Sequence, residues 1–495
     1  MSKLILRVIS LCMTVVIAGM AIACGDVGDA ANGTKTQPND DVSAETSDEV
    51  TPPELPATDM NGKNFNILEV NWMGYEPLNI TDINVTEING EILNDTAYER
   101  RIEICDKYNC GIESYPVANP TDGATALNTT IMAGENAYDI ALIRSNMYNA
   151  QLTSGNLTDL ELVPYIDITA GYYDTQSYDA LAIMDRHYGI VSNLSMNPYL
   201  LIFCAYFNKV LIDDYNLDNV YELVRNGEWT IDKMYEMGKA VASPDNSEGY
   251  DSEDVYGFTY VNDVSEGLVN AAGVQLARLA KDGTIELTYD SELSVTKMQH
   301  ILDLLKDKNT SFNIHTRPKN GADTYVIEVG MFMQRKTLFS LAGIYYAPQF
   351  REMQDDYGII PLPKYDEAQA DYYSPIFSNP FPITVIPVTN DNLEYTGILL
   401  EEMSYRGYTE LLPALYDTVL TGKCARDDDS VEMLDIIFNN KFYDIGMIFD
   451  FGGVRSELSS HFGKLDDNLV SGFESIRPKV EENIQSLLEA VENID

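Results

Sequence analysis

Aromatic and polar side chains gather just after several apolar runs that read as buried strands. An apolar run bounded by Gly and Pro is typical of a strand covered on both faces, and open α/β sheets bind ligands at the edge where such strands end. Rings can stack on a ligand there and polar groups can hydrogen-bond it, so the pattern indicates a binding protein. The residues that we predict to contact a ligand are Trp72, Tyr75, Arg144, Asn146, Tyr148, Asn193, Tyr345, Tyr346 and Arg351.

Several of these residues also have a purely structural interpretation. Trp72 and Tyr75 either form an aromatic platform for the ligand or pack locally at the end of the first strand. Arg144 either forks onto two neighbouring ligand groups or forms an ion pair between two parts of the fold. Trp229 stands at the start of a predicted helix, where we expect it in the core and not in the site.

Catalytic chemistry has no comparable signal in the sequence. The four histidines are scattered without metal-binding spacing, and neither a G-x-S-x-G motif nor a P-loop occurs. We therefore predict no enzyme, no cofactor and no metal site. A glycosidase-type carboxylate pair stays open among the 78 acidic residues, because separation in space decides it. The run 427–429 is either a fragment of a calcium loop or a solvated acidic loop.

The elements that position these residues alternate between strand and helix. Near the start, strands are predicted at 65–70, 111–117 and 138–143, with helices at 92–108 and 126–132 between them. This βαβαβ order predicts a parallel sheet with right-handed crossovers. Further strands are predicted at 188–191, 200–206, 285–289, 337–341, 357–363 and 383–386, and helices at 230–241, 268–279, 294–306, 393–405, 430–438 and 478–494. The strands near 361 and 383 look like late returns to an earlier sheet, which suggests two α/β lobes.

The N-terminus carries an export signal. Lys3 and Arg7 precede an apolar stretch at 11–22 that is short for a bilayer span, and small residues then precede Cys24. This order resembles the lipobox of bacterial lipoproteins, which implies cleavage after residue 23 and a lipid on Cys24. An uncleaved anchor helix and an ordinary secretory peptide are the alternatives. Residues 24–58 are rich in Asp, Glu, Thr, Asn and Pro, so we expect a flexible tether.

The overall charge narrows the partners. The formal net charge is −46 over 495 residues, which excludes a nucleic acid partner because its phosphates would be repelled. Cys105 and Cys110 could form a disulfide outside the cell or remain free thiols. Cys204 lies in an apolar run and is expected in the core.

Four features together resemble the extracellular solute-binding proteins of carbohydrate ABC transporters, the maltose-binding-like family. They are the lipobox at Cys24, HYGIV (187–191) followed by AYFNKVLIDDY (205–215), EWTIDKMYEMGKAV (228–241), and MFMQRKTLFSLAGIYY (331–346) followed by YGIIPLPKYDE (357–367). Arg335 stands where the family often has Gly, which affects the turn before one strand. The resemblance covers most of the chain after residue 60.

The resemblance implies a two-lobed periplasmic-binding-protein-like α/β fold of type II. Each lobe would be a mostly parallel sheet flanked by helices, with hinge strands at 200–206 and 357–363. The N-terminal lobe would hold residues 59–198 and 360–405, and the C-terminal lobe 199–359 and 406–495. A monomeric, lipid-anchored receptor on the outer (or periplasmic) side of the cell membrane would capture an oligosaccharide and deliver it to an ABC permease. Alternatives are a peptide or polyamine receptor, a surface glycan-binding lipoprotein, or a glycoside hydrolase.

Overall fold

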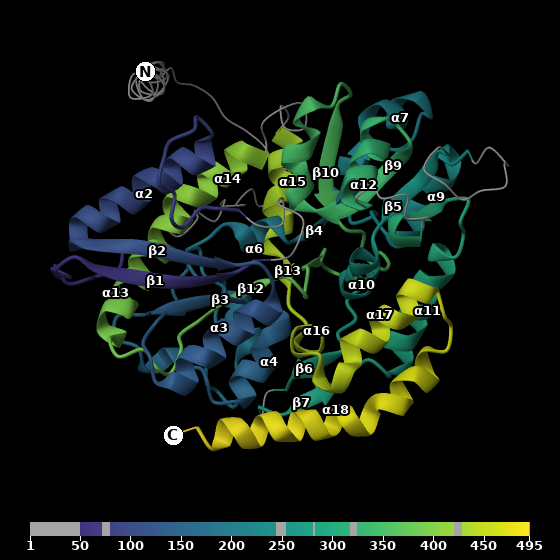
Figure 1. Ribbon diagram of the computed structural model, residues 1–495. Coiled ribbons are helices and arrows are strands. Elements are labelled where there is room, and N and C mark those ends of the chain that lie inside the picture. Colours follow the sequence, from purple (N-terminus) through teal and green to yellow (C-terminus); the bar gives the residue numbers. More distant parts are fainter. Residues whose placement is uncertain are drawn as a thin grey trace, which may run out of the picture. The chain divides into compact units, whose positions relative to one another are not determined.

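The computed structural model describes residues 50–71, 80–243, 254–280, 283–316, 324–419 and 428–494 (Figure 1). The predicted signal peptide, Cys24, most of the tether, Trp72, Tyr75 and Asp427 lie outside these ranges. Arg351 and Asp428 are described by their backbone alone. Within the described ranges, no helix combines the length and the apolar character that a membrane crossing needs.

The first sheet has four strands in the order β12-β3-β1-β2. The central strand β1 pairs in parallel with both β2 and β3, and β12 pairs with β3 in the antiparallel direction. These strands are β1 (Lys63–Val70), β2 (Cys110–Val117), β3 (Ile140–Arg144) and β12 (Pro382–Val385). The late strand near 383 thus returns to the sheet of the first three, as the sequence predicted.

The second sheet has five strands in the order β10-β4-β9-β5-β8. The strands β9, β5 and β8 run parallel, whereas β4 is antiparallel to both of its neighbours. The strands are β4 (Phe203–Asn208), β5 (Tyr256–Tyr260), β8 (Ser311–Asn313), β9 (Thr337–Gly343) and β10 (Tyr357–Pro361). The two-lobed α/β fold with two mixed, helix-flanked sheets is therefore confirmed.

Two segments carry the chain between the sheets. The first crossing leads into β4, where Ile202 forms an isolated bridge with Ile376 of the returning segment. That return runs through β11 (Ser374–Pro375), which pairs with β13 (Lys441–Phe442), and reaches β12. Both predicted hinge segments overlap strands of the second sheet: 203–206 lie in β4 and 357–361 in β10. The lobe boundary predicted at 360 falls within β10, and it stays a prediction.

Helices connect these strands. Between β1 and β4 they are α2 (Ile92–Tyr108), α3 (Pro120–Ala133), α4 (Ser145–Thr153), η2 (Leu160–Leu162), α5 (Thr175–Leu181) and α6 (Asn197–Leu200). Between β4 and β10 they are α7 (Lys209–Asp214), α8 (Val220–Arg225), α9 (Ile231–Val241), α10 (Asn262–Ala271), α11 (Glu292–Leu305), η3 (Ile314–Thr316), α12 (Thr324–Met333) and η4 (Ile344–Glu352). After β12 come α13 (Leu393–Arg406), η5 (Gly407–Leu411), α14 (Leu412–Val419) and α15 (Asp428–Asn439). A small hairpin, β6 (Ala277–Leu279) and β7 (Ile285–Leu287), stands apart from both sheets.

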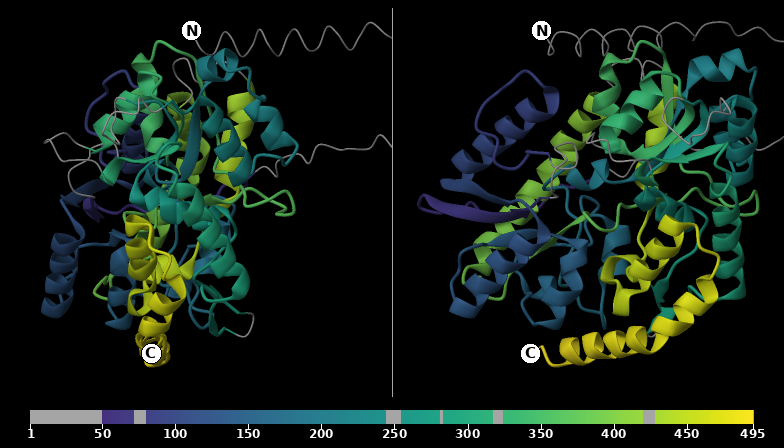
Figure 2. Two further views of the ribbon diagram at one scale, coloured as in Figure 1. Left: turned by 90° about the vertical axis from the view of Figure 1, so that its right-hand side faces the viewer. Right: turned by 45° about the vertical axis from the view of Figure 1, so that its right-hand side comes forward.

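The C-terminal elements run beneath both lobes. They are α16 (Ile445–Phe449), η6 (Phe451–Gly453), α17 (Val454–Lys464) and the long helix α18 (Leu469–Glu492), drawn in yellow in Figure 2. The Asn149 side chain of α4 donates to the Phe449 carbonyl at 2.9 Å and to Asn483 Oδ1 at 3.1 Å. On the other side, α17 packs against α10. This C-terminal block therefore contacts elements that belong to both sheets.

Some predicted elements differ from the structure. The helix expected at 268–279 is wrong: α10 ends at Ala271, Gly273 takes a positive φ of 75°, and the chain continues into β6. The Asn270 side chain stabilises this turn by donating to the Val274 carbonyl at 2.8 Å. Instead of a strand, residues 188–191 form only a single bridge through Ile190. The tight turn expected at 342–343 is the end of β9.

Other local predictions are confirmed. The Thr230 side chain accepts from the Lys233 N–H at 3.2 Å and caps α9. Trp229 is fully buried, and its indole N–H donates to the Pro361 carbonyl at 3.0 Å. Cys204 is buried in β4 as predicted. Of the two alternatives left open for Cys105 and Cys110, the structure shows free thiols. Asp429 of the acidic run forms an ion pair with Arg225.

Candidate functional site

Arg144 lies at the carboxyl end of β3, but its side chain is almost fully buried. Its guanidinium donates to Asn197 Oδ1 at 3.2 Å and to the Pro380 carbonyl. These partners belong to α6 and to the return crossing, so Arg144 ties the first sheet to the segments that connect the lobes. Burial lowers the pKa of Arg144, and the nearby Glu69 carboxylate partly opposes this shift. Arg144 Nη1 thus donates to two protein acceptors.

Three further predicted residues are spread around this edge. Asn146 is exposed on α4. Tyr148 on the same helix has no exposed surface and packs edge-to-face on Phe449, with ring centroids 5.3 Å apart. Asn193 is buried between the Tyr172 carbonyl, to which it donates at 2.7 Å, and the Tyr199 hydroxyl, from which it accepts at 2.9 Å. In this structure Tyr148 and Asn193 support the fold and offer little surface to a ligand.

Tyr345 and Tyr346 follow β9 as predicted, but both lie in the core. Their exposed fractions are 1% and 0%, and their rings meet edge-to-face at 4.9 Å. The Tyr346 hydroxyl donates at 2.8 Å to the fully buried Glu328, which lies on α12. Burial raises the pKa of Glu328 to about 8, against the hydrogen bonds from Tyr346 and Ser340. Trp72, Tyr75 and the side chain of Arg351 lie outside the described residues. Their contact with a ligand therefore stays a prediction.

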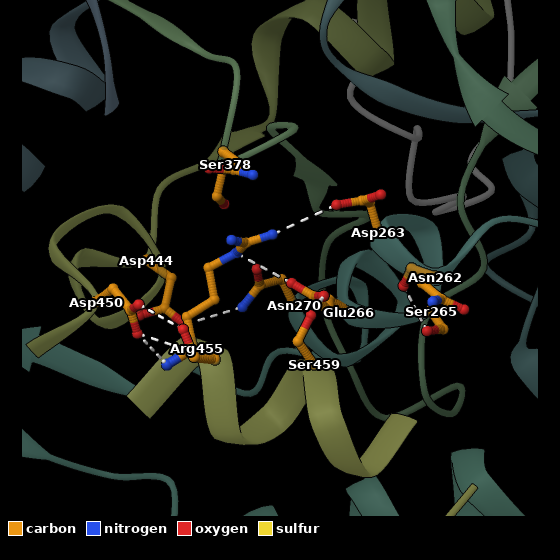
Figure 3. Close-up of polar contacts among 12 residues, drawn as sticks. Asn262, Asp263, Ser265, Glu266, Asn270, Ser378, Asp444, Asp450, Arg455 and Ser459 are labelled. Carbon is orange, nitrogen blue, oxygen red and sulfur yellow. Dashed lines mark hydrogen bonds and ion pairs between the residues drawn. The ribbon is translucent and has the colours of Figure 1, made fainter. Parts of the chain in front are cut away.

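A polar cluster that the sequence did not reveal lies at the carboxyl end of β5 (Figure 3). The Arg455 guanidinium on α17 contacts Asp263 Oδ1 at 3.4 Å and Glu266 Oε2 at 3.1 Å, both on α10. Figure 3 shows Ser378, from the return crossing, pointing toward the same guanidinium. Arg455 and Asp263 keep 13% and 23% of their side-chain surface exposed, whereas Glu266 keeps 4%.

The backbone around Arg455 is arranged by Asp450. This residue takes a left-handed conformation with φ of 44°, followed by Gly452 and Gly453, which also have positive φ. Its carboxylate accepts from the Arg455 N–H at 2.8 Å and from the Ser456 hydroxyl at 2.7 Å. A carboxylate bound to the first N–H groups of a helix is a stabilising cap. Asp450 therefore fixes the start of α17 and, with it, the position of the guanidinium.

The buried carboxylate of Asp444 holds α10 in place. It accepts from the Leu276 N–H at 2.7 Å and from the Asn270 amide at 3.0 Å. Burial raises the pKa of Asp444 to about 6, opposed by these hydrogen bonds. Because Asn270, Asp263 and Glu266 share one helix, Asp444 orients the acidic half of the cluster.

The cluster combines a buried carboxyl with a partly exposed arginine. Burial raises the pKa of Glu266 to about 7, and the Arg455 charge opposes this shift. The Ser459 hydroxyl also donates to Glu266. Asp263, Glu266 and Arg455 offer acceptors and a forked donor side by side, which suits the hydroxyl edge of a ligand. Among the described residues, no group of three or more His, Cys, Asp or Glu side chains could hold a metal ion.

Comparison with solved structures identifies the fold. An ABC substrate-binding protein from Listeria monocytogenes in complex with cycloalternan matches with a TM-score of 0.55 and 14% identity, over 86% of this chain and 99% of that one. The galacto-N-biose-/lacto-N-biose I-binding protein of a Bifidobacterium longum ABC transporter matches with a TM-score of 0.57 and 12% identity, over 86% and 98%. A cyclo/maltodextrin-binding protein complexed with maltotetraose matches at 0.53 and 15%, over 88% and 100%. No protein-family model and no curated protein sequence matches the chain.

Proposed function

We propose that this chain is the substrate-binding protein of a carbohydrate ABC importer. The observation that carries the proposal is the Arg455–Asp263–Glu266 cluster at the carboxyl end of β5, beside the crossing between the lobes, in a two-lobed fold. Ligands of α/β sheets bind at this edge. The structural neighbours with this fold bind cycloalternan, lacto-N-biose and maltotetraose, so an oligosaccharide is the ligand class that the fold and the cluster support together.

The proposed work is binding and closure without bond cleavage. A saccharide would accept hydrogen bonds from Arg455 and donate hydroxyl protons to Asp263, while the other lobe contacts its opposite side. Such a ligand favours the closed state only by its differential affinity for that state. When the lobes close, a few residues at the crossings 200–203 and 374–381 would change their φ and ψ angles.

The location and partners follow from the same proposal. A lipid on Cys24 would hold the protein at the outer face of the membrane without crossing it, and residues 24–58 would let the lobes move above the surface. The closed form would dock on the ABC permease, and other chains would hydrolyse ATP.

A thermal-shift screen tests the proposal. The purified full chain, in a detergent that carries no sugar, is mixed with maltotetraose, lacto-N-biose and other saccharides, with peptides and polyamines as controls. A ligand at one hundred times its dissociation constant adds about 2.7 kcal/mol to the free energy of unfolding. We expect a saccharide to raise the melting temperature. A response to peptides or polyamines alone would keep the fold and exclude the carbohydrate assignment.

A further inference from the structure

A second groove lies where the lobes and a crossing strand meet. It has a volume of about 510 Å³ and is lined by four parts of the chain: α5, residues 275–279 at β6, Asp371 and Tyr373 before β11, and residues 440–445 around β13. This volume lies within the range of about 300–1,000 Å³ that is usual for small-molecule sites. None of its lining residues belongs to the Arg455 cluster, so the groove is a separate site.

The groove floor offers an aromatic platform. The Tyr373 and Phe442 rings lie 4.7 Å apart with an interplanar angle of 41°, and both are half-buried. Tyr443 adds a third ring to the lining. A larger groove of about 770 Å³ borders β6, β7 and α18, but no aromatic side chain occurs among the described residues that line it. The smaller groove is therefore the better match to a flat apolar ligand face.

Polar groups also line this groove. Gln176 and Asp179 come from α5, Gln275 and Arg278 from the β6 segment, and Asp371 from the segment before β11. Amide, carboxylate and guanidinium groups supply both donors and acceptors. The one lysine of the lining, Lys441, is already paired with Asp174 at 3.0 Å. The other cation of the lining, Arg278, pairs with Glu286 at 2.7 Å. The rim thus offers donors and acceptors, and both of its cations are compensated.

We infer that this groove is a second saccharide-binding site, which takes a short neutral saccharide with one ring face on Tyr373 and Phe442. The class of ligand rests on the proposed function. The site itself rests on the aromatic pair, the mixed polar rim and the volume of the groove. One saccharide unit stacks on the platform, and its hydroxyl edges reach Gln176 and Gln275 of the lining.

A tryptophan reporter tests this site. The substitution Tyr373→Trp in the full chain adds a fluorophore to the groove floor, and the unmodified chain, titrated in parallel, subtracts the signal of the native Trp72 and Trp229. Maltotetraose and lacto-N-biose are titrated into both proteins. The reporter signal is the fluorescence of the Tyr373→Trp chain minus that of the unmodified chain. We expect this signal to change saturably with saccharide. Adding Phe442→Ala should weaken the binding about tenfold. Circular dichroism verifies that each variant is folded.

A cleft variant separates this inference from the proposed function. Adding Asp263→Ala should weaken saccharide binding measured by calorimetry and leave the reporter signal intact. If calorimetry detects saccharide binding and the reporter signal stays flat to the solubility limit, the second site is overturned and the proposed function stands. If no saccharide gives a response in either measurement, both are overturned. A reporter signal that Phe442→Ala leaves unchanged also contradicts the aromatic platform.

Discussion

At the scale of single residues, the position of a charge matters more than its presence. Arg144 and Arg455 both lie near strand ends that face the crossings, yet they differ in what they contact. Arg144 is committed to Asn197 and a backbone carbonyl, and it is 3% exposed. Arg455 stands among acidic side chains with part of its surface accessible. We therefore expect Arg455 to contact the ligand and Arg144 to position the crossing.

Arg455→Ala should weaken saccharide binding about 10- to 100-fold, because charge-assisted hydrogen bonds contribute roughly 1.5–3 kcal/mol. Calorimetric titration of the best ligand from the screen measures this effect. Arg225→Ala is the matched control, since Arg225 also pairs with acidic side chains (Glu222, Asp429 and Glu432) but lies on α8. Equal affinities in the two variants would contradict the role of Arg455.

The buried Glu328 should make stability depend on pH. Its pKa is raised to about 8 in the folded protein from an ordinary value of 4.5, so between these values the folded state holds a proton that the unfolded state has lost. Stability should therefore fall as pH rises through this window, by up to about 1.4 kcal/mol per pH unit from this group. Denaturant unfolding at several pH values should show this slope in the native chain and a shallower one in Glu328→Gln.

The exposed Glu474→Gln is the matched control for that experiment. It should leave the pH slope of the native chain unchanged. If Glu328→Gln and Glu474→Gln show the same slope, the carboxyl of Glu328 is ionised in the folded protein and its proposed neutral state is wrong.

At the scale of elements, short polar caps decide where the site residues point. Asp450 binds the start of α17, and Asp444 binds the turn between α10 and β6. Each carboxylate accepts several hydrogen bonds from a segment that also carries site residues. The helices that hold Arg455, Asp263 and Glu266 are thus fixed at their ends by side chains that the ligand need not touch.

Asp450→Ala should cost about 1–2 kcal/mol of stability through the lost cap, and it should also weaken saccharide binding because Arg455 moves with the helix. Asn219→Ala removes a comparable cap from α8, where Asn219 accepts from the Tyr221 N–H at 3.0 Å. It should lower stability similarly while leaving affinity unchanged. Thermal unfolding and calorimetry of both variants measure the two effects, and unaltered affinity in Asp450→Ala would contradict the positioning role.

Local signals predicted the elements better than the site. The helix at 92–108 has the predicted bounds, and the Thr230 cap and buried Trp229 follow from patterns within a few residues. The Arg455 cluster could not be predicted from such local patterns, because Arg455 and Asp263 are 192 residues apart in the sequence and meet through the packing of α10 on α17. The one local signal was the polar Asn262–Asp263 pair after the apolar run YGFTY at 256–260. Position after a strand also cannot distinguish an open ring from one packed inward, as Tyr345 and Tyr346 show.

At the scale of the whole molecule, the crossings join the lobes through a buried ion pair. Lys441 on β13 lies 3.0 Å from Asp174, the residue that caps α5, and its ammonium lies over the Tyr199 ring at 5.1 Å. The Tyr443 hydroxyl donates to the same carboxylate at 3.0 Å. This network links α5 beside the first sheet to the strand that pairs with the return crossing.

Lys441→Met should destabilise the protein by about 3 kcal/mol, because it leaves the buried Asp174 carboxylate without its cation. Lys107→Met is the matched control, since Lys107 pairs with Glu402 at 2.8 Å but keeps half of its side chain exposed. An exposed pair contributes less than about 1 kcal/mol. Urea unfolding compares the two variants, and similar losses would show that the Lys441 pair does not brace the crossing.

The most direct test of a carbohydrate receptor is a calorimetric titration of the full chain with the saccharide panel, followed by analysis of the recovered sugar. We expect saturable heat with at least one oligosaccharide, a loss of affinity in Arg455→Ala, and sugar recovered unchanged. Heat only with peptides or polyamines, or the release of reducing sugar during incubation, would contradict a carbohydrate-binding receptor that works without chemistry.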